Sequence, residues 1–184
     1  MISLIQLFEY LDLKDVRQSK TYTCGPAIMQ SILASYGIDS RENQLSKLMN
    51  TTKNGTNFSG FIKIAELFKI KYKYGVFTIK DIKTFIDSGF PIIMLVQAYS
   101  KNKVDYSKTY EHGHYVAPIY YDDTKIYFED PSEFKITFMT FDELESRWHG
   151  IGEYDKEEDH TGIVFFKKIS IERNHIIHME SNLI

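Results

Sequence analysis

The stretch T-C-G-P-A-I-M-Q-S-I-L-A-S-Y-G, residues 23–37, decides how the rest of this 184-residue chain can fold. Pro26 falls in a first turn, where a helix needs no N–H from it, and Gly37 follows the last turn, so the stretch predicts a helix over residues 24–36. Its apolar side chains recur at helical spacing and form one stripe, made of Ile28, Met29, Ile32, Leu33 and Tyr36. We therefore expect this helix to be a core element.

The sequence after this helix predicts two more helices and then a change to strands. Residues 41–50 favour a short second helix, and the polar run N-T-T-K-N-G-T-N-F-S-G, residues 50–60, is typical of an exposed loop. A third helix is expected to start at Ser59 or Gly60. From Ile70 onward the residues K-Y-K-Y-G-V-F-T alternate and favour a strand.

The second half of the chain predicts an antiparallel sheet. Residues 79–88 favour a short helix ended by Gly89, and the apolar run 91–98 predicts a central strand buried on both faces. The remaining expectations are a surface loop near the functional site at 99–111, a three-stranded meander at 114–121, 125–130 and 134–140, a helix at 142–148, a last strand at 162–167 and fraying after Ser170. Helices followed by an antiparallel sheet indicate the α+β class, in a single domain over residues 1–184.

Composition excludes several classes of protein. The chain has 43% hydrophobic residues and a single cysteine, so it can bury a core but form no disulfide within itself. A net charge of -3 gives no general attraction to nucleic acid or anionic lipid. No run of about 18 apolar residues predicts a membrane span. The start of the sequence lacks a basic leader and a cleavage site, so we expect a cytoplasmic protein, or one exported without an N-terminal signal peptide.

Cys24 is the residue whose position most strongly suggests chemistry. It lies at the start of the predicted helix, where backbone N–H groups and the helix dipole favour a thiolate over a thiol. A lowered thiol pKa makes a nucleophile available near neutral pH.

His114 and Asp130 are expected to meet across a hairpin whose turn contains Asp122 and Asp123. If residues 121–123 form the loop, His114 and Asp130 lie directly opposite each other, with Cβ atoms about 4.5–5.5 Å apart. A two-residue turn would put them on opposite faces. Asp130 shares a face with apolar residues and points inward, where it needs a partner such as an imidazole N–H, whereas Glu129 points the other way.

These residues can supply the parts of a thiol active site. Cys24 would be the nucleophile, His114 the base and later the acid, and Asp130 the group that orients the imidazole. Gln18, six positions before Cys24, could bring its amide beside the Cys24 backbone N–H and complete an oxyanion hole. Each residue taken singly has an ordinary structural explanation, so the hypothesis depends on the combination.

Three segments carry a resemblance to a known family: Q-S-K-T-Y-T-C-G-P-A-I-M-Q-S-I-L-A-S-Y-G, then G-H-Y-V-A-P-I-Y-Y, then I-Y-F-E-D-P. Together they resemble the peptidase C39 family, papain-like cysteine peptidases that process bacteriocin leader peptides. The resemblance covers roughly residues 17–131.

The resemblance implies a papain-like fold, a triad of Cys24, His114 and Asp130, an oxyanion hole with Gln18, no cofactor or metal, and a peptide or protein substrate. The best-known members of the family are N-terminal domains of ABC transporters that cut after a double glycine. No segment of this sequence predicts a transporter, so the substrate preference is not carried over, and the sequence sets no oligomeric state.

Weaker candidates and other functions stay open on the sequence alone. His112 is the reserve base, the stretch with Asp159 and His160 is expected to be a solvated loop, and His175 and His178 have a spacing that could suit a metal but lack a third ligand. A related acyl-transfer enzyme of transglutaminase type would use a similar triad. A papain-like module that binds an extended peptide without cutting it is the non-catalytic alternative.

Overall fold

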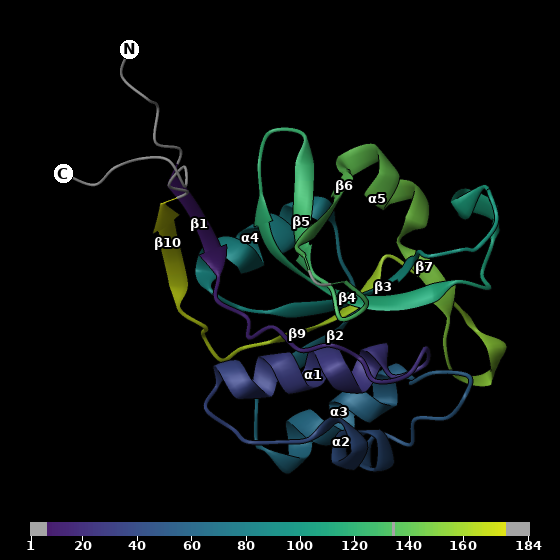
Figure 1. The fold of residues 1–184 in the computed structure, drawn as a ribbon, viewed down its shortest axis with the longest axis horizontal. Coiled ribbons are helices and arrows are strands. Elements are labelled where there is room, and N and C mark those ends of the chain that lie inside the picture. Colours follow the sequence, from purple (N-terminus) through teal and green to yellow (C-terminus); the bar gives the residue numbers. More distant parts are fainter. Residues whose placement is uncertain (1–6, 134, 176–184) are drawn as a thin grey trace.

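The computed structural model describes residues 7–133 and 135–175, and within them it contains five α-helices and ten β-strands (Figure 1). The first half holds β1 (Leu7–Leu11), α1 (Cys24–Ser35), α2 (Glu42–Leu48), α3 (Phe58–Leu67), β2 (Tyr72–Val76) and α4 (Ile79–Ser88). The second half holds β3 (Ile92–Gln97), β4 (Gly113–Tyr121), β5 (Lys125–Glu129), β6 (Thr137–Thr140), α5 (Phe141–Arg147), β7 (His149–Ile151), β8 (Glu157–Asp159), β9 (Thr161–Phe165) and β10 (Ile171–His175), with 3₁₀ turns at Tyr106–Lys108 and Glu153–Asp155.

A six-stranded antiparallel sheet with the order β2-β9-β3-β4-β5-β6 forms the centre of the molecule. Helices α1, α2 and α3 gather on one side of it, and α4 and α5 lie on the other (Figure 1). This arrangement confirms the α+β class. All six residues of β3 are buried, as expected for the apolar run at its centre.

Helix α1 is the core element that its sequence predicts. Most of its residues, including Ile28, Met29, Ile32 and Leu33, are almost completely buried. Gly25 lets the neighbouring loop approach closely, because a Cβ at this position would lie 2.9 Å from Thr56 Cβ. The close approach brings residues before α3 beside the start of α1, where Cys24 lies.

The predicted hairpin between β4 and β5 forms with a register that differs from the expected one. Tyr121 pairs with Ile126, but an irregularity between Pro118 and Tyr120 shifts the register, so that Pro118 pairs with Phe128. An extra residue in one strand reverses which residues share a face. Continued past β5, the pairing puts Asp130 opposite Val116, and His114 is its diagonal neighbour on the same face rather than its direct partner. Without the bulge the two side chains would point to opposite faces.

Three further expectations need correction. Residues 171–175 do not fray, since they form β10, which pairs with β1 and joins the two ends of the described chain, and the rest of the tail lies outside the described residues. The stretch expected to be a solvated loop contains β8, which pairs with β7. Glu158 in this strand is buried and accepts a hydrogen bond from the Tyr74 hydroxyl. The third meander strand, expected from residue 134, begins at Thr137, and residue 134 lies outside the described residues.

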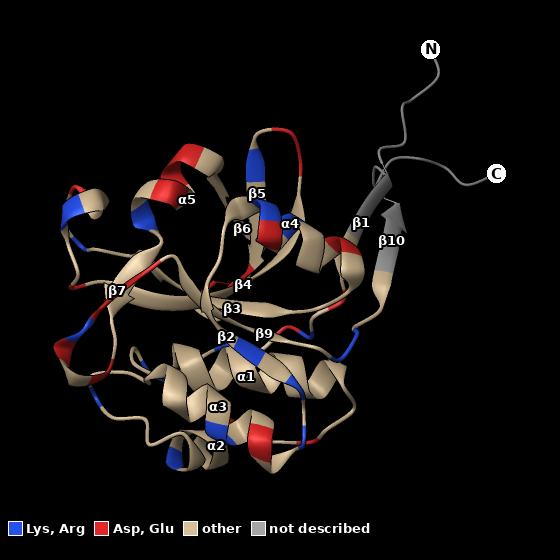
Figure 2. Cartoon of the chain, turned by 180° about the vertical axis from the view of Figure 1, so that it is seen from behind, with Lys and Arg blue, Asp and Glu red and all other residues tan. Residues whose placement is uncertain are grey.

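The surface carries both signs of charge, with acidic and basic residues interspersed in the view of Figure 2. None of the helices among the described residues has the length and apolar character required to cross a bilayer.

Candidate active site

Cys24 begins α1 and its side chain borders a cleft, although only 6% of the residue is exposed. Thr23, the residue before it, gives no side-chain cap to the helix. The His114 side chain and the backbone N–H groups of Tyr115 and Gly25 are the groups whose interactions with the sulfur lower the pKa of Cys24. The sulfur is therefore surrounded by donors, which is the environment that a thiolate needs.

His114 lies near the start of β4 and connects Cys24 to Asp130. Its Nε2 is 2.8 Å from Asp130 Oδ1, and both side chains are buried. Because Nε2 is occupied by the carboxylate, the hydrogen bond between the imidazole and the Cys24 sulfur is left to Nδ1. The structure thus brings three predicted residues into one hydrogen-bonded chain.

The electrostatics of this chain favour a thiolate–imidazolium pair. Burial alone would raise the pKa of Cys24, but the hydrogen bond and the positive charge of His114, with the two backbone N–H groups, lower it below its ordinary value. Burial would lower the pKa of His114, but the hydrogen bonds to Asp130 and Cys24 and their negative charges raise it to about 9. Between these two pKa values the proton resides on the imidazole.

Asp130 is held by four donors, three of which the sequence did not reveal. Its Oδ1 accepts from His114 and from the Ser132 backbone N–H at 2.9 Å, and its Oδ2 accepts from the hydroxyls of Tyr99 at 2.5 Å and Thr137 at 3.1 Å. Burial would raise the pKa of this carboxyl, but His114, Tyr99 and Ser132 lower it. The carboxylate is therefore ionised and fixed in orientation.

Tyr99 is the clearest residue that the sequence analysis missed. Its ring packs edge-on against the His114 ring, with centroids 5.2 Å apart. Its backbone has a φ of 62°, a left-handed conformation that is unusual for a bulky side chain. The only signal in the sequence was its place directly after the central strand, at the start of the loop that we expected near the site.

Gln18 lies in the segment that leads into α1 and reaches the same region through its amide. Its Nε2 donates to the Lys20 carbonyl at 2.8 Å, and its Oε1 accepts from the Ser132 hydroxyl at 2.8 Å. Its backbone N–H donates to the Pro131 carbonyl at 2.9 Å. The segment is thereby attached to the turn that follows Asp130.

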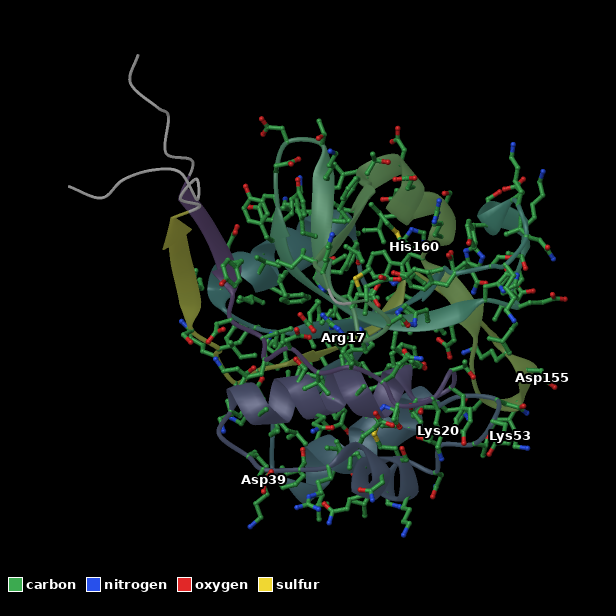
Figure 3. All side chains as sticks on the ribbon, viewed as in Figure 1. Arg17, Lys20, Asp39, Lys53, Asp155 and His160 are labelled. Atoms are coloured by element: carbon green, nitrogen blue, oxygen red, sulfur yellow. The ribbon has the colours of Figure 1, made fainter. Side chains whose placement is uncertain are left out.

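Glu129, which was expected to point away from the face of Asp130, is also buried. Arg17, which lies between α1 and the sheet (Figure 3), covers it with Nη1 3.2 Å from Glu129 Oε1 and 2.9 Å from the Asp130 carbonyl oxygen. Burial and the nearby Asp15 raise the pKa of Glu129 to about 7, against the opposing effect of Arg17. A second ionisable pair thus lies directly behind the Asp130 turn.

The cleft beside Cys24 has a volume of about 690 Å³. One wall is the loop before α3, and the other is formed by β4, Leu95 and the segment between β7 and β8. Lys53 and Asp155 come from opposite walls and lie at the same end of the molecule (Figure 3). The cleft is open enough to hold an extended peptide next to the sulfur.

The model of the Peptidase_C39 like family matches residues 10–156, most of the chain. The chain belongs to the Peptidase_C39 like family. This confirms the resemblance drawn from the three sequence segments, and the matched region contains Gln18, Cys24, His114 and Asp130.

Two relatives of this C39-like protein are uncharacterized proteins from methanogens. That of Methanothermobacter marburgensis is 27% identical over 117 residues, covering 64% of this chain and 70% of its own. That of Methanothermobacter thermautotrophicus is 25% identical over 122 residues, covering 66% of this chain and 74% of its own.

Solved structures share the fold of the C39-like protein. The peptidase domain of Streptococcus ComA, a bifunctional ABC transporter, has a TM-score of 0.61 at 21% identity, over 89% of this chain and 99% of that domain. A Bacillus anthracis protein described as a C39-like peptidase has a TM-score of 0.68 at 13% identity, over 88% and 99%. A double glycine motif protease from an AMS/PCAT transporter, in complex with the leader peptide, has a TM-score of 0.60 at 16% identity, over 88% and 99%.

The other candidates of the sequence analysis lie elsewhere in the C39-like protein. His112 packs against the Tyr106 ring, and its backbone N–H donates to Gln97 Oε1. His160 bonds with Asp159 and Glu145, each at 2.8 Å, beside α5. The His175 side chain and His178 lie outside the described part of the structure. In residues 7–133 and 135–175, no group of three His, Cys, Asp or Glu side chains is placed to hold a metal ion.

Proposed function

We propose that this protein is a cysteine peptidase that hydrolyses peptide bonds with Cys24 as nucleophile. The observation that supports this most directly is the hydrogen-bonded chain from Cys24 through His114 to Asp130, which borders an open cleft. The lowered pKa of Cys24 and the raised pKa of His114 are the shifts that a thiolate–imidazolium pair requires.

In the first half-reaction the Cys24 thiolate attacks the carbonyl carbon of the scissile peptide bond. A C–S bond forms, and the carbonyl electron pair moves to oxygen, giving a tetrahedral oxyanion. As the oxyanion collapses, the C–N bond breaks and the His114 imidazolium gives its proton to the leaving amine. The product is a thioester on Cys24, with His114 neutral.

The oxyanion needs donors that are in place before the reaction. We assign this role to the Gln18 side-chain amide and to backbone N–H groups at the start of α1, where the helix dipole also favours negative charge. Gln18 is suited to the task because its amide is held from both ends.

In the second half-reaction a water molecule replaces the amine. Neutral His114 removes a proton from the water as it attacks the thioester carbon, and the C–S bond then breaks to regenerate the thiolate–imidazolium pair. Throughout, Asp130 keeps Nε2 of His114 protonated, so that Nδ1 faces the reacting atoms.

The substrate class that we propose is a peptide or the extended segment of a protein. The cleft beside Cys24 has a volume of about 690 Å³ and is lined largely by polar groups. The structurally similar double glycine motif protease holds a leader peptide, which makes a peptide with small residues at the cut a reasonable first probe.

The test uses a peptide ending in Gly-Gly linked to aminomethylcoumarin, together with iodoacetamide. We expect wild-type protein to release the fluorophore, and Cys24→Ala to abolish the release while retaining the circular dichroism spectrum of the wild type. Iodoacetamide should modify Cys24 at pH 7 much faster than it modifies free cysteine, because the lowered pKa of Cys24 raises the fraction of thiolate at that pH.

Three other results would overturn or replace the proposal. Turnover that survives in Cys24→Ala removes the nucleophile from the mechanism. Slow alkylation of Cys24, together with a tight and uncleaved peptide complex, would identify a binding module. Preferential transfer of the acyl group to an added amine would identify an acyl-transfer enzyme instead of a hydrolase.

A further inference from the structure

Ser132 makes hydrogen bonds to both Asp130 and Gln18. Its backbone N–H donates to Asp130 Oδ1 at 2.9 Å, and its hydroxyl donates to Gln18 Oε1 at 2.8 Å. The two contacts use different atoms of Ser132, so the side chain and the main chain have separable effects. Only the hydroxyl contact depends on residue type.

The hydrogen-bond pattern fixes which way the Gln18 amide faces. The Lys20 carbonyl can only accept, so the amide nitrogen must be the end that faces it, at 2.8 Å. The oxygen end then faces Ser132, and the Ser132 hydroxyl must be the donor. Two polar groups from opposite sides therefore select one of the two orientations of the amide.

The same contacts hold the amide beside the start of α1. The Lys20 carbonyl also accepts from the Thr23 backbone N–H at 3.1 Å and from the Thr23 hydroxyl at 3.0 Å, in the turn that leads directly to Cys24. The amide nitrogen carries two hydrogens, and donation to Lys20 uses one of them. Donation by Ser132 to the amide oxygen polarises the group and makes the nitrogen a stronger donor through its other hydrogen.

We propose that Ser132 is a positioning residue that acts through Gln18, because its hydroxyl orients and polarises the amide that stabilises the oxyanion. This inference rests on the proposed peptidase function. Ser132 itself touches no reacting atom. Its effect is exerted on the transition state, in which the oxyanion exists, and not on the thiolate–imidazolium pair of the resting enzyme.

The experiment compares Ser132→Ala with Ser132→Thr, a matched control that retains a hydroxyl. Both are measured for hydrolysis of the Gly-Gly aminomethylcoumarin peptide, for inhibition by the peptide aldehyde ending in Gly-Gly, and for alkylation by iodoacetamide. The aldehyde adds to the thiolate and forms a tetrahedral oxyanion, whereas alkylation forms none. The three readouts therefore separate oxyanion stabilisation from thiolate reactivity.

We expect Ser132→Ala to lower kcat by about 5- to 10-fold, the effect of losing one ordinary hydrogen bond, with KM nearly unchanged. The aldehyde should bind more weakly by a similar factor, and the rate of alkylation should stay that of the wild type. Ser132→Thr should remain within about twofold of the wild type in every readout. In a Gln18→Ala background, Ser132→Ala should have no further effect, because the group through which it acts is missing.

Three outcomes would overturn the inference. The first is an unchanged kcat in Ser132→Ala, and the second is an equal loss in both the wild-type and the Gln18→Ala backgrounds. The third is a parallel loss of alkylation rate, which would mean that Ser132 acts on Cys24, His114 or the fold. If wild-type protein shows no Cys24-dependent turnover, the peptidase proposal and this inference fail together, whereas normal wild-type turnover with an unaffected Ser132→Ala rejects only the inference.

Discussion

At the scale of single residues, Asp130 should set the pH above which the proposed peptidase activity is lost. The pKa of His114 is about 9, raised by Asp130 and Cys24 against the effect of burial. The imidazolium that protonates the leaving amine in the proposed mechanism is therefore present below about pH 9 and lost above it. Asp130→Asn removes the negative charge, so we expect kcat/KM to fall by about 100-fold or more and the basic limb to move to lower pH. Rates of peptide hydrolysis and of alkylation across pH measure both effects, and an unmoved basic limb in Asp130→Asn would contradict this role.

The residues of the site differ in how visible they were in the sequence. Cys24, His114 and Asp130 each stood in a local pattern, namely the start of a helix, the start of a strand and the end of the next strand. Tyr99 and Ser132 had no such pattern, because their roles come from contacts across 31 and 114 positions of the chain. Local signals identify the groups that we propose to react, and only the folded structure identifies the groups that hold them.

At the scale of elements, the β4–β5 hairpin shows why a correct contact can follow from an incorrect register. Direct pairing of His114 with Asp130 was expected, but the strands are offset, and the two residues are diagonal neighbours. The hydrogen bond forms nevertheless, because the bulge between Pro118 and Tyr120 restores a common face. A bulge follows from backbone packing and has no reliable signal in a single sequence, so neither the register nor the cause of the shared face could be predicted.

Another prediction at this scale concerns the contact between β7 and β3. A Cβ at Gly150 would lie 2.4 Å from Cδ2 and 2.7 Å from Cγ of Leu95, a residue that also lines the cleft. We expect Gly150→Ala to destabilise the protein by about 1–3 kcal/mol in urea unfolding and to raise KM for the Gly-Gly peptide, because Leu95 must move. Gly75→Ala in β2 is the control, since nothing lies within 4 Å of its Cβ position. Equal stability of the two variants would contradict the close packing.

At the scale of the whole molecule, most elements were predictable but their assembly was not. Helix α4 has the predicted bounds, with Gly89 at a φ of 78° after its end, since caps and breakers are local features. The place of β9 between β2 and β3, and the pairing of β1 with β10 at the ends of the described chain (Figure 1), depend on contacts between distant segments. Periodicity indicates which face of a strand is buried, and it does not indicate which strand lies beside it.

The segment before α1 is joined to the sheet by Arg17, and the stability of the whole protein should depend on pH through that contact. Arg17 pairs with Glu129, whose pKa of about 7 lies above the ordinary value, so Glu129 stabilises the fold at low pH and this stabilisation is lost as pH rises through 7. Removing the guanidinium in Arg17→Ala raises that pKa further and leaves a buried carboxylate without this cation. We expect the loss of unfolding free energy to be about 3 kcal/mol at pH 8 and clearly smaller at pH 5, where Glu129 is protonated.

In a Glu129→Gln background the loss should be the same at both pH values, and urea unfolding of the four proteins at pH 5 and pH 8 measures it. A penalty for Arg17→Ala that does not change with pH in the wild-type background would show that the guanidinium stabilises the fold by packing, and not through the charge of Glu129.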